Sequence, residues 1–255
     1  MGFGNRLFPW ARCHLHSVEY HVPMLAPRWW WPPRVRPLLR EFPPPGEVAG
    51  HLYIRGLRAL PEYLSGMRRM LIETTSREEI VFFRGEEGRL GELHGNETEL
   101  LTALQRICTV RLPLRVSYIG MHVRRGDFSS AARTQLSWFV AALRALRRKL
   151  RKDVPALVVS DGTAGGLAEL LAEPHTQLIR TGVPLADLLA LSGARVLLAS
   201  GSSFSAWAAF LGGMPAVTER DHSLAWYGAR ARSFLGHFDP AHDNTEFLRA
   251  AAGAF

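Results

Sequence analysis

Three groups of polar residues carry side chains suited to binding an anion, and each group follows an apolar segment of the chain. The groups are residues 122–127 (HVRRGD), 160–163 (SDGT) and 200–203 (SGSS), which follow the apolar segments 116–121, 156–159 and 195–199. Arginine guanidinium groups bind phosphate oxygens in pairs, and main-chain N–H groups at a helix start add further donors. The residue types therefore suit a phosphate-bearing ligand.

The apolar segments before these groups have the lengths of buried β-strands. They alternate with segments of helical periodicity at residues 136–150, 167–171, 185–191 and 204–211, and further short strands are expected at 177–179 and 215–217. Strands that alternate with helices at this spacing predict βαβ units and a parallel sheet. Ligands of such sheets bind outside the carboxyl ends of the strands. We therefore expect the three polar groups to face one site.

Arg124 and Arg125 form the most informative pair in the first group. Adjacent arginines after a buried strand repel each other unless an anion or an acidic side chain lies between them. Asp127 could be that acid, which would make the group a structural ion pair. Alternatively, one arginine binds a phosphate while the other pairs with Asp127. Both interpretations fit the residue types, and the geometry has to decide between them.

Two predicted helix starts carry polar side chains that have either a structural or a binding use. Ser202 and Ser203 precede the helix that is expected to begin near Phe204, and Gly201 lets the backbone approach a ligand closely. A helix start can hold a phosphate, although a serine there more commonly caps the helix. Asp187 complements the dipole of another helix start, or accepts hydrogen bonds from a ribose or a guanine.

Composition and charge narrow the class of protein. The 255 residues are 47% apolar and 21% charged, as in globular proteins, and the net charge of +8 comes almost wholly from arginine. A basic surface suits an anionic partner: a nucleic acid, a membrane face or a phosphate-bearing substrate. The two cysteines are too few for a disulfide framework. No apolar run has the length of a membrane span, so we expect a cytoplasmic protein.

The chain is expected to divide into two α/β halves and a terminal helix. The predicted segments are an N-terminal half over residues 1–114 with a Trp/Pro-rich loop at 27–46, a C-terminal half over 115–242, and a helix over 243–255 capped by Asp243 or Asn244. Within the first half, a Gly-x-Gly turn opens the chain. Helices are expected over residues 50–72 and 98–108, and a strand over 80–83.

The polar groups resemble the motifs of a known family. Residues 122–128, HVRRGDF, resemble the His-x-Arg-Arg-Gly-Asp-Tyr motif of the α-1,2-fucosyltransferase family. Residues 187–207 resemble the family's later signature, in which an Asp and a strand precede Asn-Ser-Ser-Phe-Ser-Trp-Trp. Residues 2–8, GFGNRLF, are similar to its N-terminal Gly-Leu-Gly-Asn-Gln-Met-Phe loop. Order and spacing agree from residue 2 to about residue 217, so the ordered set is more specific than any single motif.

The resemblance implies a fold, a reaction and a donor. The fold is α/β of the GT-B type, with two Rossmann-like halves, and the C-terminal half binds the donor. The reaction is an inverting, metal-independent transfer of fucose from GDP-fucose to a sugar hydroxyl of a glycan, with α-1,2 linkage, in the synthesis of a bacterial polysaccharide or glycolipid. No cofactor is implied beyond the donor substrate. The partners are the nucleotide sugar and the glycan acceptor, with contact at the inner face of a membrane through the basic surface.

The resemblance also implies roles for individual residues. Arg124 would hold the β-phosphate, and Arg125 would support the site. The other implied donor-binding residues are His122 and Asp187 at the nucleoside, Ser202, Ser203 and Phe204 at the diphosphate, Asp161 after the middle strand, and Gly2, Gly4 and Asn5 at the cleft. The catalytic residues would be Arg124 and Asp127. The candidates for a base that activates the acceptor are Asp127, Glu219, Asp221 and His222.

Three positions depart from the family pattern, and they leave alternatives open. Gly201 replaces the family's Asn, Ala206 replaces its first Trp, and Gly162 replaces the second Asp after the middle strand. The glycine loop begins at residue 2, so we expect the N-terminal half to lack its first strand. The alternatives are a transferase of the same fold that uses another nucleotide sugar, or a truncated or inactive nucleotide-sugar-binding protein. A nucleic-acid binder is not expected, because the basic residues form no tract interleaved with aromatics.

Overall fold

The computed structural model describes most of the C-terminal two thirds of the chain and parts of the remainder. The described residues are 2–21, 24–27, 39–42, 53–54, 83, 85, 89–110, 112, 116–126, 133–219, 224–229, 234–242 and 245–255. The chain divides into two compact units, one made of Met1–Asn5 with Gly88–Phe255 and the other of Arg6–Glu87. The predicted boundaries at residues 114 and 242 stay predictions.

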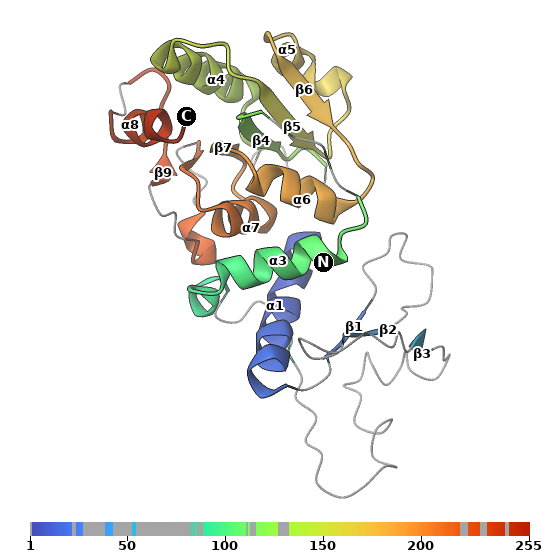
Figure 1. The fold of residues 1–255 in the computed structure, drawn as a ribbon. Helices are drawn as coiled ribbons and strands as arrows, with labels where there is room; N and C mark the ends of the chain where they lie inside the picture. Colours follow the sequence, from blue (N-terminus) through green and yellow to red (C-terminus); the bar gives the residue numbers. More distant parts are fainter. Residues whose placement is uncertain are drawn as a thin grey trace, which may run out of the picture. The chain divides into compact units, whose positions relative to one another are not determined.

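Six strands among the described residues of the larger unit form one parallel sheet (Figure 1). They are β4 (Ile119–Val123), β5 (Ala156–Ser160), β6 (Thr176–Ile179), β7 (Val196–Ala199), β8 (Ala216–Thr218) and β9 (Leu235–His237), in the spatial order β6-β5-β4-β7-β8-β9. All neighbouring pairs run parallel. The predicted α/β fold with a parallel sheet is therefore confirmed.

Helices cover both faces of this sheet (Figure 1). The described helices of the unit are α3 (Glu97–Ile107), α4 (Leu136–Leu150), α5 (Ala168–Leu171), α6 (Pro184–Ser192), α7 (Ser203–Gly212) and α8 (Thr245–Gly253), with short 3-10 turns at Gly91–Leu93, Gly165–Leu167 and Ala225–Tyr227. Helices α4 and α8 lie on one face, while α6 and α7 lie on the other with α3 packed against α7. The predicted terminal helix is confirmed as α8, and its predicted caps lie outside the described residues.

The alternation of side chains along β4 decides which residues enter the core and which face the site. Ile119, Met121 and Val123 join the apolar cluster under α4 and α8, which also contains the fully buried Phe139. Because successive strand residues point to opposite faces, His122 faces α6 and α7. Its hydrogen-bond contact with α7 agrees with this direction.

Gly120 lets helix α6 approach the strand on that second face. A Cβ atom at this position would lie 3.4 Å from Leu191 Cδ2 in α6 and 2.8 Å from the Cβ of Ala194 just after it, which is too close for unstrained packing. The Tyr118 hydroxyl donates to the Ala190 carbonyl at 2.5 Å and fastens the same helix to the start of β4. Burial raises the pKa of that hydroxyl to about 12, so it keeps its proton. Strand β4, which contains His122, is thus held against helix α6.

The described part of the smaller unit differs from the N-terminal half expected from the sequence. Helix α1 spans Phe3–Tyr20 and begins in the larger unit, so Gly4 lies in a helix and the predicted Gly-x-Gly turn is wrong. Strands β1 (Met24–Pro27), β2 (Leu39–Phe42) and β3 (Tyr53–Ile54) pair antiparallel, unlike the parallel sheet that was expected. The strand β3 replaces part of the helix predicted over 50–72.

Most of the remaining N-terminal predictions fall on residues that the structure does not describe. The Trp/Pro-rich loop at 27–46 is described only at Pro27 and at residues 39–42 of β2. The rest of the helix over 50–72 and nearly all of the strand over 80–83 lie outside the described residues. The helix predicted over residues 98–108 is confirmed as α3.

Candidate functional site

The three predicted polar groups meet at the carboxyl ends of β5, β4 and β7, which are neighbours in the sheet. The main-chain N–H of Arg124 donates to Ser200 Oγ at 3.0 Å, and the N–H of Arg125 donates to Asp161 Oδ1 at 2.6 Å. On the β5 side, Ser160 Oγ donates to the Val123 carbonyl at 2.6 Å. The segment after β4 is therefore bonded to the segments on both sides of it, and the three groups form one surface.

Two glycines allow the segments after β4 and β5 to pack directly against each other. A Cβ atom at Gly126 would lie 2.7 Å from Asp161 Oδ2, and one at Gly162 would lie 2.9 Å from the Cβ of Arg125. Real Cβ atoms do not approach other atoms this closely, so any larger residue would push the segments apart. Gly162, a departure from the family pattern, therefore makes room for Arg125.

The acid that accompanies the arginine pair in the described residues is Asp161. Its Oδ2 lies 3.5 Å from Arg124 Nε, and the two side chains are 40% and 22% exposed. At that distance and exposure the ion pair adds little stability, but it orients the guanidinium. Asp127, which the sequence analysis considered for this role, lies outside the described residues.

The side chain of Arg125 differs from that of Arg124 in its hydrogen bonding. Its Nε is buried and has no hydrogen-bond partner among the described residues. Burial lowers the pKa of its guanidinium, and the positive charge of Arg133 lowers it further. A buried donor without a partner costs free energy, so this N–H is suited to donate to an anion or an acidic side chain. The described geometry leaves both arginines as candidates for phosphate binding.

His122 is buried at the centre of the site, with 5% of its surface exposed. Its Nδ1 lies 2.6 Å from Ser205 Oγ, and Ser205 Oγ donates its single proton to the Ser200 carbonyl at 2.6 Å. The histidine must therefore donate from Nδ1, which leaves Nε2 as an acceptor. Burial lowers the pKa of His122 to about 4, and the Arg124 charge contributes to this. The ring is consequently neutral at physiological pH.

Ser205 is a site residue that the sequence analysis missed. It is fully buried and links His122 to the segment after β7. Its spacing could have indicated this role. A residue three positions after the N-cap lies in the first turn of the helix, on the same side of the helix as the cap. In the sequence, Ser205 is part of the SSFS run that was assigned to the diphosphate through Ser202, Ser203 and Phe204.

Ser202 caps helix α7. Of the two uses expected for this serine, capping the helix and binding a phosphate, the described contacts therefore show the first. Its side chain accepts a hydrogen bond from Ser205 N at 3.2 Å, and the residue is 2% exposed. The first main-chain bond of the helix runs from Ala206 N to Ser202 O. Ser203 and Phe204 are the first two residues of α7, so their main-chain N–H groups have no acceptor within the helix. These two groups are therefore the donors that this helix start offers to an anion.

The beginning of the chain packs against the same helix start. A Cβ atom at Gly4 would lie 2.7 Å from Ser203 Oγ and 2.8 Å from Phe204 N. Ser203 Oγ donates to Asn5 Oδ1. Gly2, by contrast, is exposed and has nothing within 4 Å of its Cβ direction. Of the three N-terminal residues predicted at the site, Gly4 and Asn5 therefore contact it directly.

Asp187 stabilises the turn between β6 and α6. Its Oδ1 accepts from Thr181 N at 3.1 Å and from Thr181 Oγ1 at 2.8 Å. Only one of its two oxygens is used in this way, so Oδ2 can still accept a bond from a ligand. None of its described hydrogen bonds reaches the groups after β4, β5 and β7.

The candidates for a base that activates the acceptor are only partly described. Glu219 follows β8, and its Oε2 accepts from Gln135 N at 3.1 Å, which joins it to the start of α4. Asp127, Asp221 and His222 lie outside the described residues. Within the described ranges, no group of three or more His, Cys, Asp or Glu side chains is arranged to hold a metal ion. None of the helices described is both long and apolar enough to cross a bilayer.

The sequence of this chain matches the model of one protein family. The model of the family described as Glycosyl transferase family 11 matches residues 82–225, which is more than half of the chain and includes all three polar groups. No curated protein sequence matches the chain.

Several solved structures match parts of this chain at low sequence identity and low TM-score. UDP-GlcNAc 2-epimerase of Methanocaldococcus jannaschii, in complex with UDP-GlcNAc and UDP, has a TM-score of 0.38 and 13% identity, over 63% of this chain and 42% of that one. Spinosyn rhamnosyltransferase SpnG has a TM-score of 0.35 and 18% identity, over 57% and 38%. ADP-heptose LPS heptosyltransferase II of E. coli has a TM-score of 0.38 and 9% identity, over 70% and 55%. The chain spans about two fifths of the length of the first two.

Proposed function

This chain belongs to glycosyl transferase family 11, the family of the α-1,2-fucosyltransferases, and we propose that it transfers fucose from GDP-fucose to a sugar hydroxyl of a glycan. The observation that carries the proposal is the convergence of an arginine pair, a helix start and a buried neutral histidine at the carboxyl ends of β4 and β7. That edge of a parallel sheet is where nucleotides bind in α/β folds. The proposal includes a GT-B arrangement of the fold, an α-1,2 linkage, and a bacterial polysaccharide or glycolipid as the acceptor.

The proposed chemistry is stabilisation of the departing GDP. As the bond to the sugar breaks, negative charge grows on the β-phosphate. The Arg124 guanidinium, oriented by Asp161, and the N–H groups of Ser203 and Phe204 would bind that charge. Arg125 would support this arrangement with its buried Nε. Groups that are fixed before the reaction need no reorganisation when the charge appears, and this is the source of their catalytic effect.

Two hydrogen-bond acceptors, one on His122 and one on Asp187, would recognise the nucleoside. Guanine presents N–H donors at N1 and at its exocyclic amine, and a neutral His122 with a free Nε2 can accept one of them. The unused oxygen of Asp187 can accept a second, or a bond from the ribose. Uracil and thymine bear a single N–H donor between two carbonyl groups. A site that offers only hydrogen-bond acceptors therefore matches guanine better than it matches these two bases.

The acceptor hydroxyl requires a base as it attacks the sugar. Asp127, Glu219, Asp221 and His222 remain the candidates for that role. The bond from Gln135 N to Glu219 holds one oxygen of that carboxylate and leaves the other able to take a proton. We propose a cytoplasmic location at the inner face of a membrane, where the basic chain would meet its glycan acceptor.

Calorimetric titration with GDP, UDP and dTDP tests the donor. We expect GDP to bind and the other two to bind at least tenfold more weakly, followed by fucose transfer or slow donor hydrolysis with GDP-fucose. Binding of UDP or dTDP in preference to GDP would favour the alternative of another nucleotide sugar. Binding of GDP with neither transfer nor hydrolysis would favour an inactive nucleotide-sugar-binding protein.

A further inference from the structure

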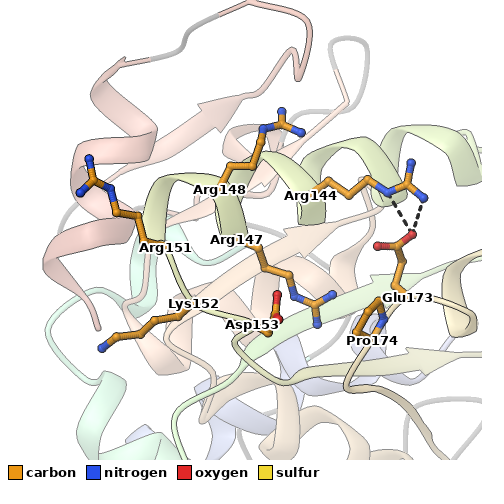
Figure 2. Close-up of a pocket in the computed structure, with 8 residues that line it drawn as sticks. All are labelled: Arg144, Arg147, Arg148, Arg151, Lys152, Asp153, Glu173 and Pro174. Carbon is orange, nitrogen blue, oxygen red and sulfur yellow. Dashed lines mark hydrogen bonds and ion pairs between the residues drawn. The ribbon is translucent and has the colours of Figure 1, made fainter.

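A second concave surface, which the proposed reaction does not use, lies at the other end of the sheet (Figure 2). The cavity has a volume of about 390 Å³ and opens to solvent. Its lining residues are Arg144, Arg147, Arg148, Arg151, Lys152, Asp153, Glu173 and Pro174. We call this surface the α4 groove, because the last two turns of α4 and the segment after it supply most of the lining.

The α4 groove is separated from the candidate site by the length of the strands. Residues 151–155 lead into the amino end of β5, and Pro174 precedes the amino end of β6. The polar groups of the candidate site follow the carboxyl ends of the same strands. A five-residue strand is roughly 13 Å long, so one small ligand does not reach both places.

The groove carries five cationic and two anionic side chains, a net charge of +3. Two of the cations are fixed in position by the protein. Arg144 donates from Nε and Nη2 to Glu173 Oε1 at 3.0 and 2.6 Å. Arg147 is buried and donates from Nε and Nη2 to the Val154 carbonyl at 3.1 and 2.9 Å. Burial lowers the pKa of Arg147, although its charge persists.

The remaining cations have no such partners. Arg148, Arg151 and Lys152 are exposed, and within the part of the chain that the structure describes they form no side-chain hydrogen bond or ion pair. Arg148 lies one helical turn from Arg144 on α4, and the charged ends of Arg148, Arg151 and Lys152 extend outward from the groove (Figure 2). Several like charges around one open cavity repel one another weakly in solvent, and an anion bound among them would relieve that repulsion.

The dipole of α4 explains only part of this arrangement. Cations in the last turn of a helix are favourable, and this accounts for Arg147, Arg148 and Lys149. Arg151 is the left-handed C-cap and Lys152 lies beyond the helix, and both line the groove, whereas Lys149 does not. Four of the five cations are arginines, whose guanidinium forks match the oxygen pairs of a phosphate.

We propose that the α4 groove binds a phosphate-bearing anion, with Arg148, Arg151 and Lys152 as its direct ligands. Arg144 and Arg147 form the fixed wall against which the anion lies. The phosphate is either that of a soluble diphosphate or that of an acidic lipid headgroup. These two sources share the same recognition chemistry, and an experiment with two arms separates them.

The test compares two triple variants of the full chain. The first, R148Q/R151Q/K152Q, removes the proposed ligands. The second, R106Q/K149Q/R249Q, removes the same charge from exposed positions outside the groove. One arm titrates inorganic pyrophosphate by calorimetry, and the other measures sedimentation with vesicles of phosphatidylglycerol and phosphatidylcholine or of phosphatidylcholine alone. Arg124→Ala identifies any pyrophosphate bound at the candidate site.

We expect the groove variant to bind pyrophosphate or the acidic vesicles at least tenfold more weakly than the control variant. Loss in the pyrophosphate arm identifies a soluble ligand, and loss only with acidic vesicles identifies a lipid headgroup. Equal losses in the two triple variants, absence of binding in both arms, or pyrophosphate binding that disappears only in Arg124→Ala would overturn the proposal.

Discussion

At the scale of single residues, the buried His122 makes stability depend on pH. Its pKa in the folded protein is about 4, whereas an unfolded histidine titrates near 6.5. Between these values the unfolded chain binds a proton that the folded protein does not, so stability is fully present above about pH 6.5 and is lost as the pH falls toward 4. We expect a loss of about 2 to 4 kcal/mol in the free energy of unfolding from this group.

Urea unfolding between pH 7.5 and pH 4.5 measures this dependence. The variant His122→Gln lacks the titrating group, so its stability should change less over the same range. Similar pH dependence in the variant and the natural protein would mean that another group causes the effect.

The hydroxyl of Ser205 determines which nitrogen of His122 carries the proton. Replacement by alanine leaves the Nδ1–H of a buried ring without its acceptor at 2.6 Å, at a cost of about 1 to 3 kcal/mol in stability. If Nε2 accepts a hydrogen bond from guanine, the affinity for GDP should also fall. A double-mutant cycle with His122→Gln checks the coupling, because the effect of Ser205→Ala should shrink in that background.

Removal of the Arg124 guanidinium tests the proposed phosphate contact. Loss of one fixed charge-stabilising donor typically lowers the rate constant by about 100- to 1000-fold. We expect Arg124→Ala to lower fucose transfer by that factor, while Arg195→Ala, an exposed arginine outside the site, leaves transfer unchanged. An unchanged rate in Arg124→Ala, with a large loss in Arg125→Ala, would transfer the phosphate contact to the neighbouring residue.

At the scale of elements, the contact between the starts of α1 and α7 depends on Gly4. An alanine there would bring a Cβ atom to 2.8 Å from the main-chain nitrogen of Phe204, and a main-chain atom in a helix does not move aside easily. We expect Gly4→Ala to lower the stability by about 1 to 3 kcal/mol and to weaken GDP binding. Gly2→Ala is a matched control, since nothing lies within 4 Å of its Cβ direction. Equal melting temperatures for the two variants would show that the helix starts are not packed tightly.

The elements of the larger unit could be predicted where their apolar segments are long and regular. The strands β5 and β7 and the helices α4 and α7 were found by this pattern. The strand expected over residues 116–121 is β4 at Ile119–Val123, so His122 and Val123 lie inside the strand rather than after it. The polar ends of the three strands met as the topology of parallel sheets requires. The strand β9 was missed because the sequence Leu235-Gly-His237 has no alternating or continuous apolar pattern. The turn expected at Gly4 was wrong because glycine there serves a close packing contact inside a helix.

At the scale of the whole molecule, the family could be predicted because its motifs keep their order along the chain, and the match over residues 82–225 confirms it. The partners of individual side chains could not be predicted in the same way. The pairing of Arg124 with Asp161 depends on the register between β4 and β5, in which Val123 lies beside Ser160. Similarly, the α4 groove forms from residues that are distant from any motif, and only the fold brings Glu173 and Pro174 beside α4.

The two anion sites proposed for this molecule should act independently, because they lie at opposite ends of the sheet. Mutations more than about 10 Å apart that share no partners usually have additive effects. We therefore expect R148Q/R151Q/K152Q to change the affinity for GDP by less than twofold at 0.15 M salt, where surface charges are screened over about 8 Å. Calorimetry with GDP on the variant and the natural protein measures this. A tenfold change would instead mean that the strands transmit an effect between their two ends, and that the α4 groove regulates the site at the other end.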